Sequence, residues 1–304
     1  MRTDETNLID PNGVEVFFRR WLPEDDPNAI VLVLHGLSEH SGRYARFAGA
    51  LVDAGCAVYA DDHRGFGRTS ATTGRGVTGP GGFEGIVGSI RALHDQALAD
   101  LGPLPVVVFG HSMGSVLAQA YVQQHSEDVD GLVLSGSLGP AAELEEMAAG
   151  LQAMVDAGEG EKPLDALTGF NDAFEPARTP YDWLSRDPAE VDAYIADPMS
   201  GDGNQPTTGF MAGFLTLLGE VVTSDAIGGL DTEMPVLFIT GEADPVSNGG
   251  ESVRVLEERY RKAGHEVTAH YYPEARHEVL NETNRDEITA DVVAWLRNVV
   301  ELSG

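Results

Sequence analysis

The stretch VVVFGHSMGSVLAQAYV, residues 106–122, decides the fold of this 304-residue chain. Four apolar residues lead into Gly110, and an amphipathic run follows Gly114, so the pattern predicts a buried strand that turns sharply into a helix. Between the two glycines lies a G-x-S-x-G pattern centred on Ser112. A side chain at either glycine would clash with the crowded backbone of such a turn. The turn is therefore expected to lift Ser112 clear of the backbone.

A serine hydroxyl is a weak nucleophile until a neighbouring base takes its proton. Asp244 and His277 follow Ser112 in chain order, and each comes directly after a predicted strand. Because the carboxyl ends of parallel strands meet at one edge of a sheet, we expect the three side chains to lie together there. Ser112 would attack, His277 would act as the base, and Asp244 would orient the imidazole. Glu242 is a second candidate for the acidic partner.

The developing negative charge on a substrate oxygen needs two N–H donors. One is expected from Met113, the residue after the nucleophile, at the N-terminus of the predicted helix. The other is expected from Leu37 in the loop LHGLSEHSGRY, residues 34–44, which follows an early buried strand. Met113 and Leu37 are therefore the predicted oxyanion hole.

Along the rest of the chain, apolar runs typical of buried strands alternate with amphipathic patterns typical of helices. Strands are expected at 14–23, 29–36, 56–62, 104–110, 129–137, 234–241 and 266–273, and helices at 43–55, 83–101, 115–125, 250–263 and 285–301. Such alternation predicts an α/β fold with a mostly parallel central sheet and helices on both faces.

Residues 139–232 interrupt this alternation with several helical patterns and no convincing strand. They predict a helical cap inserted into a core formed by residues 1–138 and 233–304. A cap would cover the carboxyl ends of the strands, where open α/β sheets bind their ligands. The alternative is a helical excursion that only enlarges the hydrophobic core.

Composition excludes several classes of function. The formal net charge is −30, and such a field repels nucleic acids and anionic membranes, so no nucleic-acid partner is expected. No apolar run approaches the length of a membrane span, and the N-terminal residues do not resemble a secretory signal. The single cysteine, Cys56, lies in an apolar run and is expected to be a core residue. A cytoplasmic location is therefore expected.

Several motifs together resemble one family. HGLSEHSGRY (35–44), DHRGFGRTS (62–70), GHSMGS (110–115) and YDWLSRD (181–187) resemble the monoacylglycerol lipase and lysophospholipase-like branch of the α/β-hydrolase superfamily. The resemblance implies an eight-stranded sheet, a helical cap and a serine–histidine–aspartate triad that uses no metal or cofactor. Its motif positions match the triad and the oxyanion donors named above.

The cap contains the nearly all-apolar stretch GFMAGFLTLLGEVV, residues 209–222. One face of this helix would pack on the sheet, and another would line a channel for an acyl chain. The candidate substrate-binding residues are Phe210, Met211, Phe214 and Leu215. Burial of an acyl chain would contribute about 0.8 kcal/mol per methylene. The alternative is that these side chains only pack the cap against the core.

The charge of the cap narrows the expected substrate. Residues 139–232 carry 18 acidic side chains and three basic ones, so an anionic head group would find few partners. We therefore expect a hydrolase of uncharged acyl esters such as monoacylglycerols, with at most transient contact with lipid surfaces. The alternatives are a lysophospholipase, or a serine aminopeptidase or amidase that binds an amine through the acidic cap. Thioester or C–C hydrolysis comes after these. A hydrolase-fold binding protein without activity is the non-enzymatic alternative.

Overall fold

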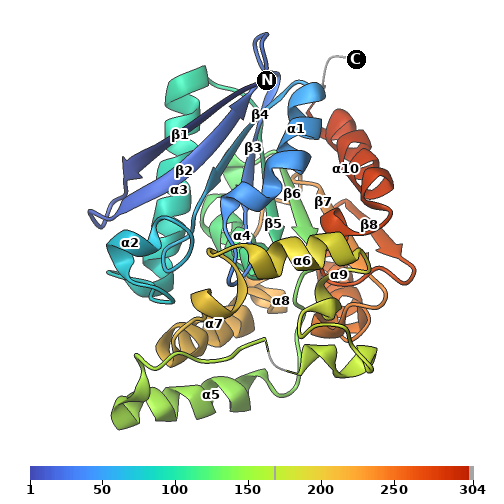
Figure 1. Cartoon of the computed structure of the whole chain (residues 1–304). Helices are drawn as coiled ribbons and strands as arrows, with labels where there is room; N and C mark the ends of the chain where they lie inside the picture. Colours follow the sequence, from blue (N-terminus) through green and yellow to red (C-terminus); the bar gives the residue numbers. More distant parts are fainter. Residues whose placement is uncertain (168, 301–304) are drawn as a thin grey trace.

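The computed structural model describes residues 1–167 and 169–300. Within them the strands form one eight-stranded sheet in the order β1-β2-β4-β3-β5-β6-β7-β8 (Figure 1). Its strands are β1 (Arg2–Ile9), β2 (Glu15–Leu22), β3 (Ala29–Leu34), β4 (Cys56–Asp61), β5 (Val106–His111), β6 (Gly131–Ser135), β7 (Val236–Gly241) and β8 (Val267–Tyr272). The β1–β2 and β2–β4 pairs are antiparallel, and every pair from β4 to β8 is parallel. This confirms the predicted α/β sheet.

The strand β1 is an element that the sequence pattern did not predict. Its side chains are exposed except at Leu8, so the strand has no apolar face that periodicity could reveal. It is an edge strand, and its backbone pairs with β2 over its whole length. Charged cross-strand contacts add to this pairing, for instance the 3.0 Å contact between Arg19 Nε and Glu5 Oε1.

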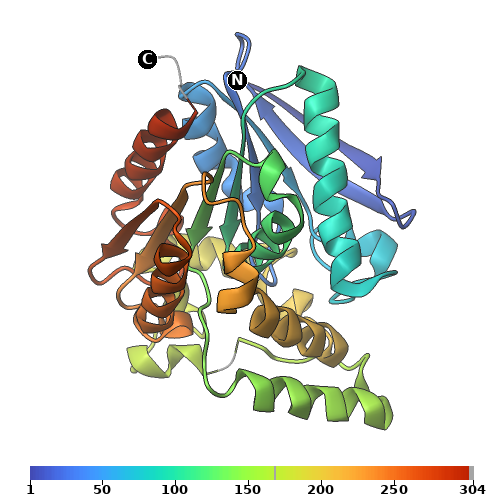
Figure 2. The same ribbon diagram turned by 180° about the vertical axis from the view of Figure 1, so that it is seen from behind.

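Helices cover both faces of the sheet (Figure 2). The side chains of α1 (Ala45–Asp53) and α10 (Arg285–Val299) pack with Val107 and Phe109 of β5 on one face. The helices α3 (Gly82–Leu101), α4 (Met113–His125) and α9 (Glu251–Ala263) pack on the other face. The alternation of side chains along β5 therefore supplies both hydrophobic layers, and this explains its continuous apolar sequence.

The segment 139–232 lies beyond one end of the sheet (Figure 1). Its α-helices are α5 (Leu144–Met154), α6 (Pro188–Ala196), α7 (Thr208–Val221) and α8 (Ser224–Gly228). The helix α7 packs on α3 and α4 of the core, whereas α5 packs mainly on α7 and has no buried residue. The division into a core and a cap at these boundaries stays a prediction.

Two further expectations concerned the position of Cys56 and the length and apolarity of the helices. Cys56 is fully buried at the start of β4, and burial raises the pKa of its thiol to about 12. Among the described residues, no helix is both long and apolar enough to cross a membrane.

Candidate active site

Ser112 lies at the sharp turn between β5 and α4. Its backbone has φ 52° and ψ −119°, outside the regions that non-glycine residues ordinarily adopt. Its N–H donates to the carbonyl oxygen of Ser135, at 3.0 Å, and this bond ties the turn to β6. Strained backbone of this kind persists only where the surroundings hold it, and it is concentrated at functional sites.

The two glycines of the motif allow this turn because the backbone closes tightly around them. A Cβ on Gly110 would lie 2.3 Å from the carbonyl oxygen of Gly114. A Cβ on Gly114 would lie 2.1 Å from the carbonyl oxygen of Leu34 on β3. Both distances are far below any van der Waals contact, so α4 can approach the sheet this closely only with glycine at both positions.

His277 follows β8, and Asp244 follows β7, as the order of the chain predicted. The Nδ1 atom of His277 lies 3.0 Å from Oδ2 of Asp244, and both side chains are buried. The other carboxylate oxygen of Asp244 accepts the N–H of Val246, at 2.9 Å, so the carboxylate is held in place. With Nδ1 directed at Asp244, Nε2 is the ring nitrogen left to exchange a proton elsewhere.

Burial by itself would lower the pKa of His277, but the charge and hydrogen bond of Asp244 raise it above the ordinary value. The second acidic candidate, Glu242, is exposed and pairs with Arg254 at 2.8 Å. The structure therefore brings Asp244, and not Glu242, to the histidine.

Two aromatic rings contact His277. The Trp183 ring centroid lies 5.2 Å from the His277 ring, and the His111 ring centroid lies 4.9 Å from it. Burial, reinforced by the positive charge of His277, lowers the pKa of His111 to about 4. His111 is therefore neutral near pH 7 and does not add a charge beside His277. Neither ring contact was predicted, because both depend on long-range packing.

The loop that contains Leu37 is held from inside the core by a buried carboxylate. The N–H of Gly36 donates to Glu39 Oε1 at 2.6 Å, and the hydroxyl of Tyr44 donates to the same oxygen at 2.8 Å. Arg43 donates to Glu39 Oε2 at 2.6 Å and binds both oxygens of Glu278 at 2.6 and 2.8 Å.

Glu278 is the residue that follows His277, so Arg43 joins the Leu37 loop to the histidine loop. Burial alone would raise the pKa of Glu39, but the charge of Arg43 holds it below its ordinary value. No role was predicted for Glu39, Arg43 or Glu278 from the sequence. Glu39 and Arg43 do lie within the HGLSEHSGRY motif, which was the available signal.

Ser112, Met113, Leu37 and His277 line one cavity of about 650 Å³. Its other walls are mostly apolar and come mainly from α5, α7 and the connection between them, with Leu138 and Val246 from outside this stretch. These lining residues are Leu138, Leu144, Met147, Gly150, Leu151, Leu164, Asp165, Ala166, Leu167, Phe170, Trp183, Met211, Phe214, Leu215, Leu218 and Val246. The volume is typical of a small-molecule site.

Of the four predicted substrate-binding residues, Met211, Phe214 and Leu215 line this cavity. Phe210 instead packs edge-to-face on Phe66 and Phe83, with ring centroids 5.2 and 5.0 Å away. The cause is the helical period, which directs neighbouring side chains of α7 to different faces. The lining residues on α5 were not predicted, although its amphipathic pattern was a usable signal.

The cavity walls carry little charge. Among the described lining residues the titratable ones are Asp165 and His277, and none is a lysine or arginine. Among all the described residues, no group of three or more His, Cys, Asp and Glu side chains could hold a metal ion.

The mostly parallel sheet, with a strained serine at the β5–α4 turn and an aspartate and histidine after later strands, defines an α/β-hydrolase. Solved structures agree. A thermostable carboxyl esterase from Bacillus coagulans in complex with glycerol is similar over 99% of both chains, with a TM-score of 0.91 and 28% identity. A lipase in an open form matches 98% of this chain and 99% of its own, with a TM-score of 0.89 and 30% identity.

The chain belongs to the family described as serine aminopeptidase, S33, whose model matches residues 25–284. A monoacylglycerol lipase from Mycolicibacterium smegmatis is 33% identical over 300 residues, which are 96% of each chain. These findings confirm the resemblance to the monoacylglycerol lipase branch, and they identify the chain as a carboxylic ester hydrolase.

Proposed function

We propose that this enzyme hydrolyses uncharged acyl esters, namely monoacylglycerols or similar lipid esters, through an acyl-enzyme on Ser112. One observation carries the proposal: Ser112 and His277 line the same apolar cavity, and Asp244 occupies the other ring nitrogen of His277. A nucleophile, its base and the group that orients the base are therefore assembled at an acyl-binding site.

In the proposed first step, Ser112 Oγ attacks the ester carbonyl carbon while Nε2 of His277 takes the hydroxyl proton. Asp244 stabilises the resulting imidazolium. The N–H groups of Leu37 and Met113 receive the negative oxygen of the tetrahedral intermediate. The carbon–oxygen bond to the leaving alcohol then breaks, and His277 returns the proton to that alcohol. Water repeats the sequence on the acyl-enzyme and releases the carboxylic acid.

The cavity supports an uncharged lipid ester as the substrate. Its apolar walls suit an acyl chain, which would gain about 0.8 kcal/mol per buried methylene. No described lining residue offers a lysine or arginine to a phosphate, which disfavours a lysophospholipid. The similar esterase from Bacillus coagulans was solved with glycerol, the alcohol of a monoacylglycerol.

A cytoplasmic location and transient contact with lipid surfaces belong to the same proposal. Met147 and Met154 on α5 are 54% and 36% exposed, and α5 forms the outer wall of the cavity. A brief contact of this helix with a lipid surface would bring a monoacylglycerol close to the cavity.

The test compares kcat/KM for p-nitrophenyl esters of increasing length, 1-monoacylglycerols, lysophosphatidylcholine and an aminoacyl anilide. Ser112→Ala is expected to lose more than about 10³-fold in kcat. The matched control is Ser224→Ala, because Ser224 is exposed at the start of α8. A serine-directed phosphonate should add covalently to the wild type and to the control, but not to Ser112→Ala.

Each other outcome overturns a part of the proposal. Preferred cleavage of the anilide would indicate an aminopeptidase or amidase on the same triad. Preference for lysophosphatidylcholine would contradict the argument from charge. Full activity of Ser112→Ala would exclude Ser112 as the nucleophile, and a wild type that cleaves nothing would return the binding-protein alternative.

A further inference from the structure

Ser38, directly after Leu37, has an unusual backbone conformation. Its φ is 56°, in the left-handed region that favours glycine, and the residue is fully buried. A serine stays in this conformation only when its surroundings hold it there. Because Leu37 and Ser38 are adjacent, the direction of the Leu37 N–H depends on what holds Ser38.

Within the described residues, three hydrogen bonds hold Ser38, and their partners all lie in the segment 139–232. Its carbonyl oxygen accepts the N–H of Gly201 at 3.0 Å and the hydroxyl of Tyr194 at 3.2 Å. Its own hydroxyl donates to the carbonyl oxygen of Asn204 at 3.0 Å. We call residues 194–204, which supply these three groups, the brace.

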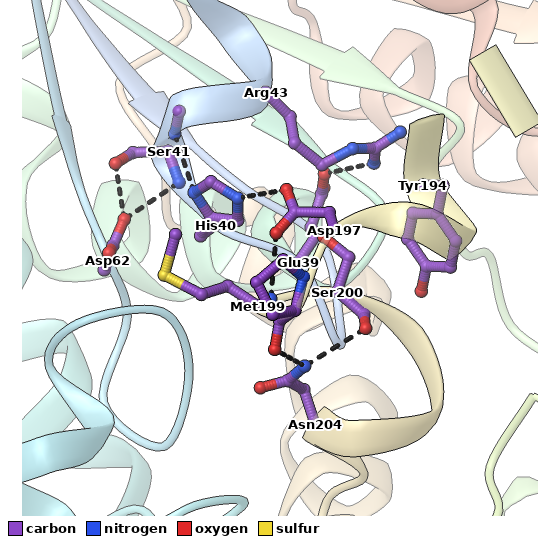
Figure 3. A network of polar contacts seen from close by, with 12 residues as sticks. Glu39, His40, Ser41, Arg43, Asp62, Tyr194, Asp197, Met199, Ser200 and Asn204 are labelled. Carbon is purple, nitrogen blue, oxygen red and sulfur yellow. Dashed lines mark hydrogen bonds and ion pairs between the residues drawn. The ribbon is translucent and has the colours of Figure 1, made fainter. Parts of the chain in front are cut away.

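A fourth contact joins the brace to the same loop. Nδ1 of His40 accepts the N–H of Gly42 at 3.1 Å, so in the neutral ring the proton is on Nε2. Nε2 lies 2.8 Å from Asp197 Oδ2 and donates to it (Figure 3). The loop is therefore fixed to the brace on both sides of Glu39.

The brace is itself stiffened by internal hydrogen bonds. The amide of Asn204 donates to the carbonyl oxygens of Pro198 and Ser200, each at 3.1 Å (Figure 3). The guanidinium of Arg43 lies 4.7 Å from the ring centroid of Tyr194, which fixes the tyrosine against the core. Tyr194 is 2% exposed, so its hydroxyl cannot replace the hydrogen bond to the Ser38 carbonyl oxygen with one to bulk water.

We propose that the brace positions the oxyanion loop, and that Tyr194 is a positioning residue for the Leu37 N–H. This inference rests on the proposed function of the site. It divides the segment 139–232 into two roles: α5 and α7 form the acyl cavity, whereas residues 194–204 hold the catalytic backbone. In the described structure the core supports this loop at Gly36, and the brace supports it at Ser38.

The test is Tyr194→Phe, which removes one hydroxyl and keeps the ring. Its matched control is Tyr59→Phe, because Tyr59 is also buried and its hydroxyl donates to Asp100 Oδ2 at 2.9 Å, outside the brace and the oxyanion loop. Two quantities are measured: kcat and KM for a p-nitrophenyl ester, and the inhibition constant of an acyl trifluoromethyl ketone. That ketone forms an oxyanion on the serine and so reports on the oxyanion hole.

For Tyr194→Phe we expect kcat to fall about five- to tenfold, as for the loss of one hydrogen bond. The inhibition constant should rise by a similar factor, while KM stays within about twofold. Tyr59→Phe should change neither quantity. Ser38→Ala removes the third bond from the loop side, and it serves as the second variant if Tyr194→Phe does not fold.

A lowered melting temperature with an unchanged inhibition constant, in either variant, would show that the brace is only structural and would overturn the inference. The proposed function is judged separately by Ser112→Ala. If Ser112→Ala is inactive and Tyr194→Phe matches the wild type, only the inference fails. If Ser112→Ala remains active, the proposed function fails as well.

Discussion

Replacing Gly114 by alanine tests the proposed geometry of the active-site turn. The new Cβ would lie 2.1 Å from the carbonyl oxygen of Leu34, so the start of α4 must retreat from β3 by roughly 0.9 Å to reach 3.0 Å. Ser112 and Met113 are carried on that end of the helix. Since a misplacement of about 1 Å at a reacting centre costs about 100-fold in rate, we expect kcat/KM to fall about 100-fold. The free energy of unfolding should fall by about 1–3 kcal/mol.

The assay is ester hydrolysis combined with urea denaturation. Gly219→Ala is the control, because Gly219 lies within α7 and a Cβ there meets no atom within 4 Å. This control should keep its activity and gain up to about 1 kcal/mol in stability, as expected for alanine in a helix. A Gly114→Ala enzyme with kcat/KM within twofold of the wild type would refute the argument that the close approach of α4 to β3 sets the reacting geometry.

Three further predictions concern charge and cavity shape. Asp244→Asn removes the charge that raises the pKa of His277, so the acid limb of the pH profile of kcat/KM should move to lower pH, and kcat should fall about 10⁴-fold. An acid limb that does not move would contradict the pairing of Asp244 with His277. Arg43→Met leaves two buried carboxylates unpaired, so the free energy of unfolding measured by urea denaturation should fall by about 3–5 kcal/mol. A fall below about 1 kcal/mol would contradict the structural role of Arg43. Met211→Trp narrows the cavity, and the preferred p-nitrophenyl ester should become shorter; an unchanged optimum would place the acyl chain elsewhere.

Much of the fold could be predicted because its signals are local. The buried strands are continuous apolar runs, and the order of Ser112, Asp244 and His277 along the chain follows from where those runs end. The edge strand β1 was missed because backbone pairing and charged contacts hold it, and neither leaves an apolar period. Phe210 was expected in the cavity, but the rotation of α7 packs it on Phe66 instead.

The sequence by itself determined the turn around Ser112, because glycine spacing and flanking periodicity act over a few residues. It also determined the charge of the segment 139–232, which is a property of composition. Only the tertiary structure decided which groups hold the Leu37 loop. Glu39 supports it from the core, and Tyr194 and Asn204 support it from about 160 residues further along the chain. Such contacts leave no periodic signal, because each depends on the packing of distant segments and not on the residues beside it.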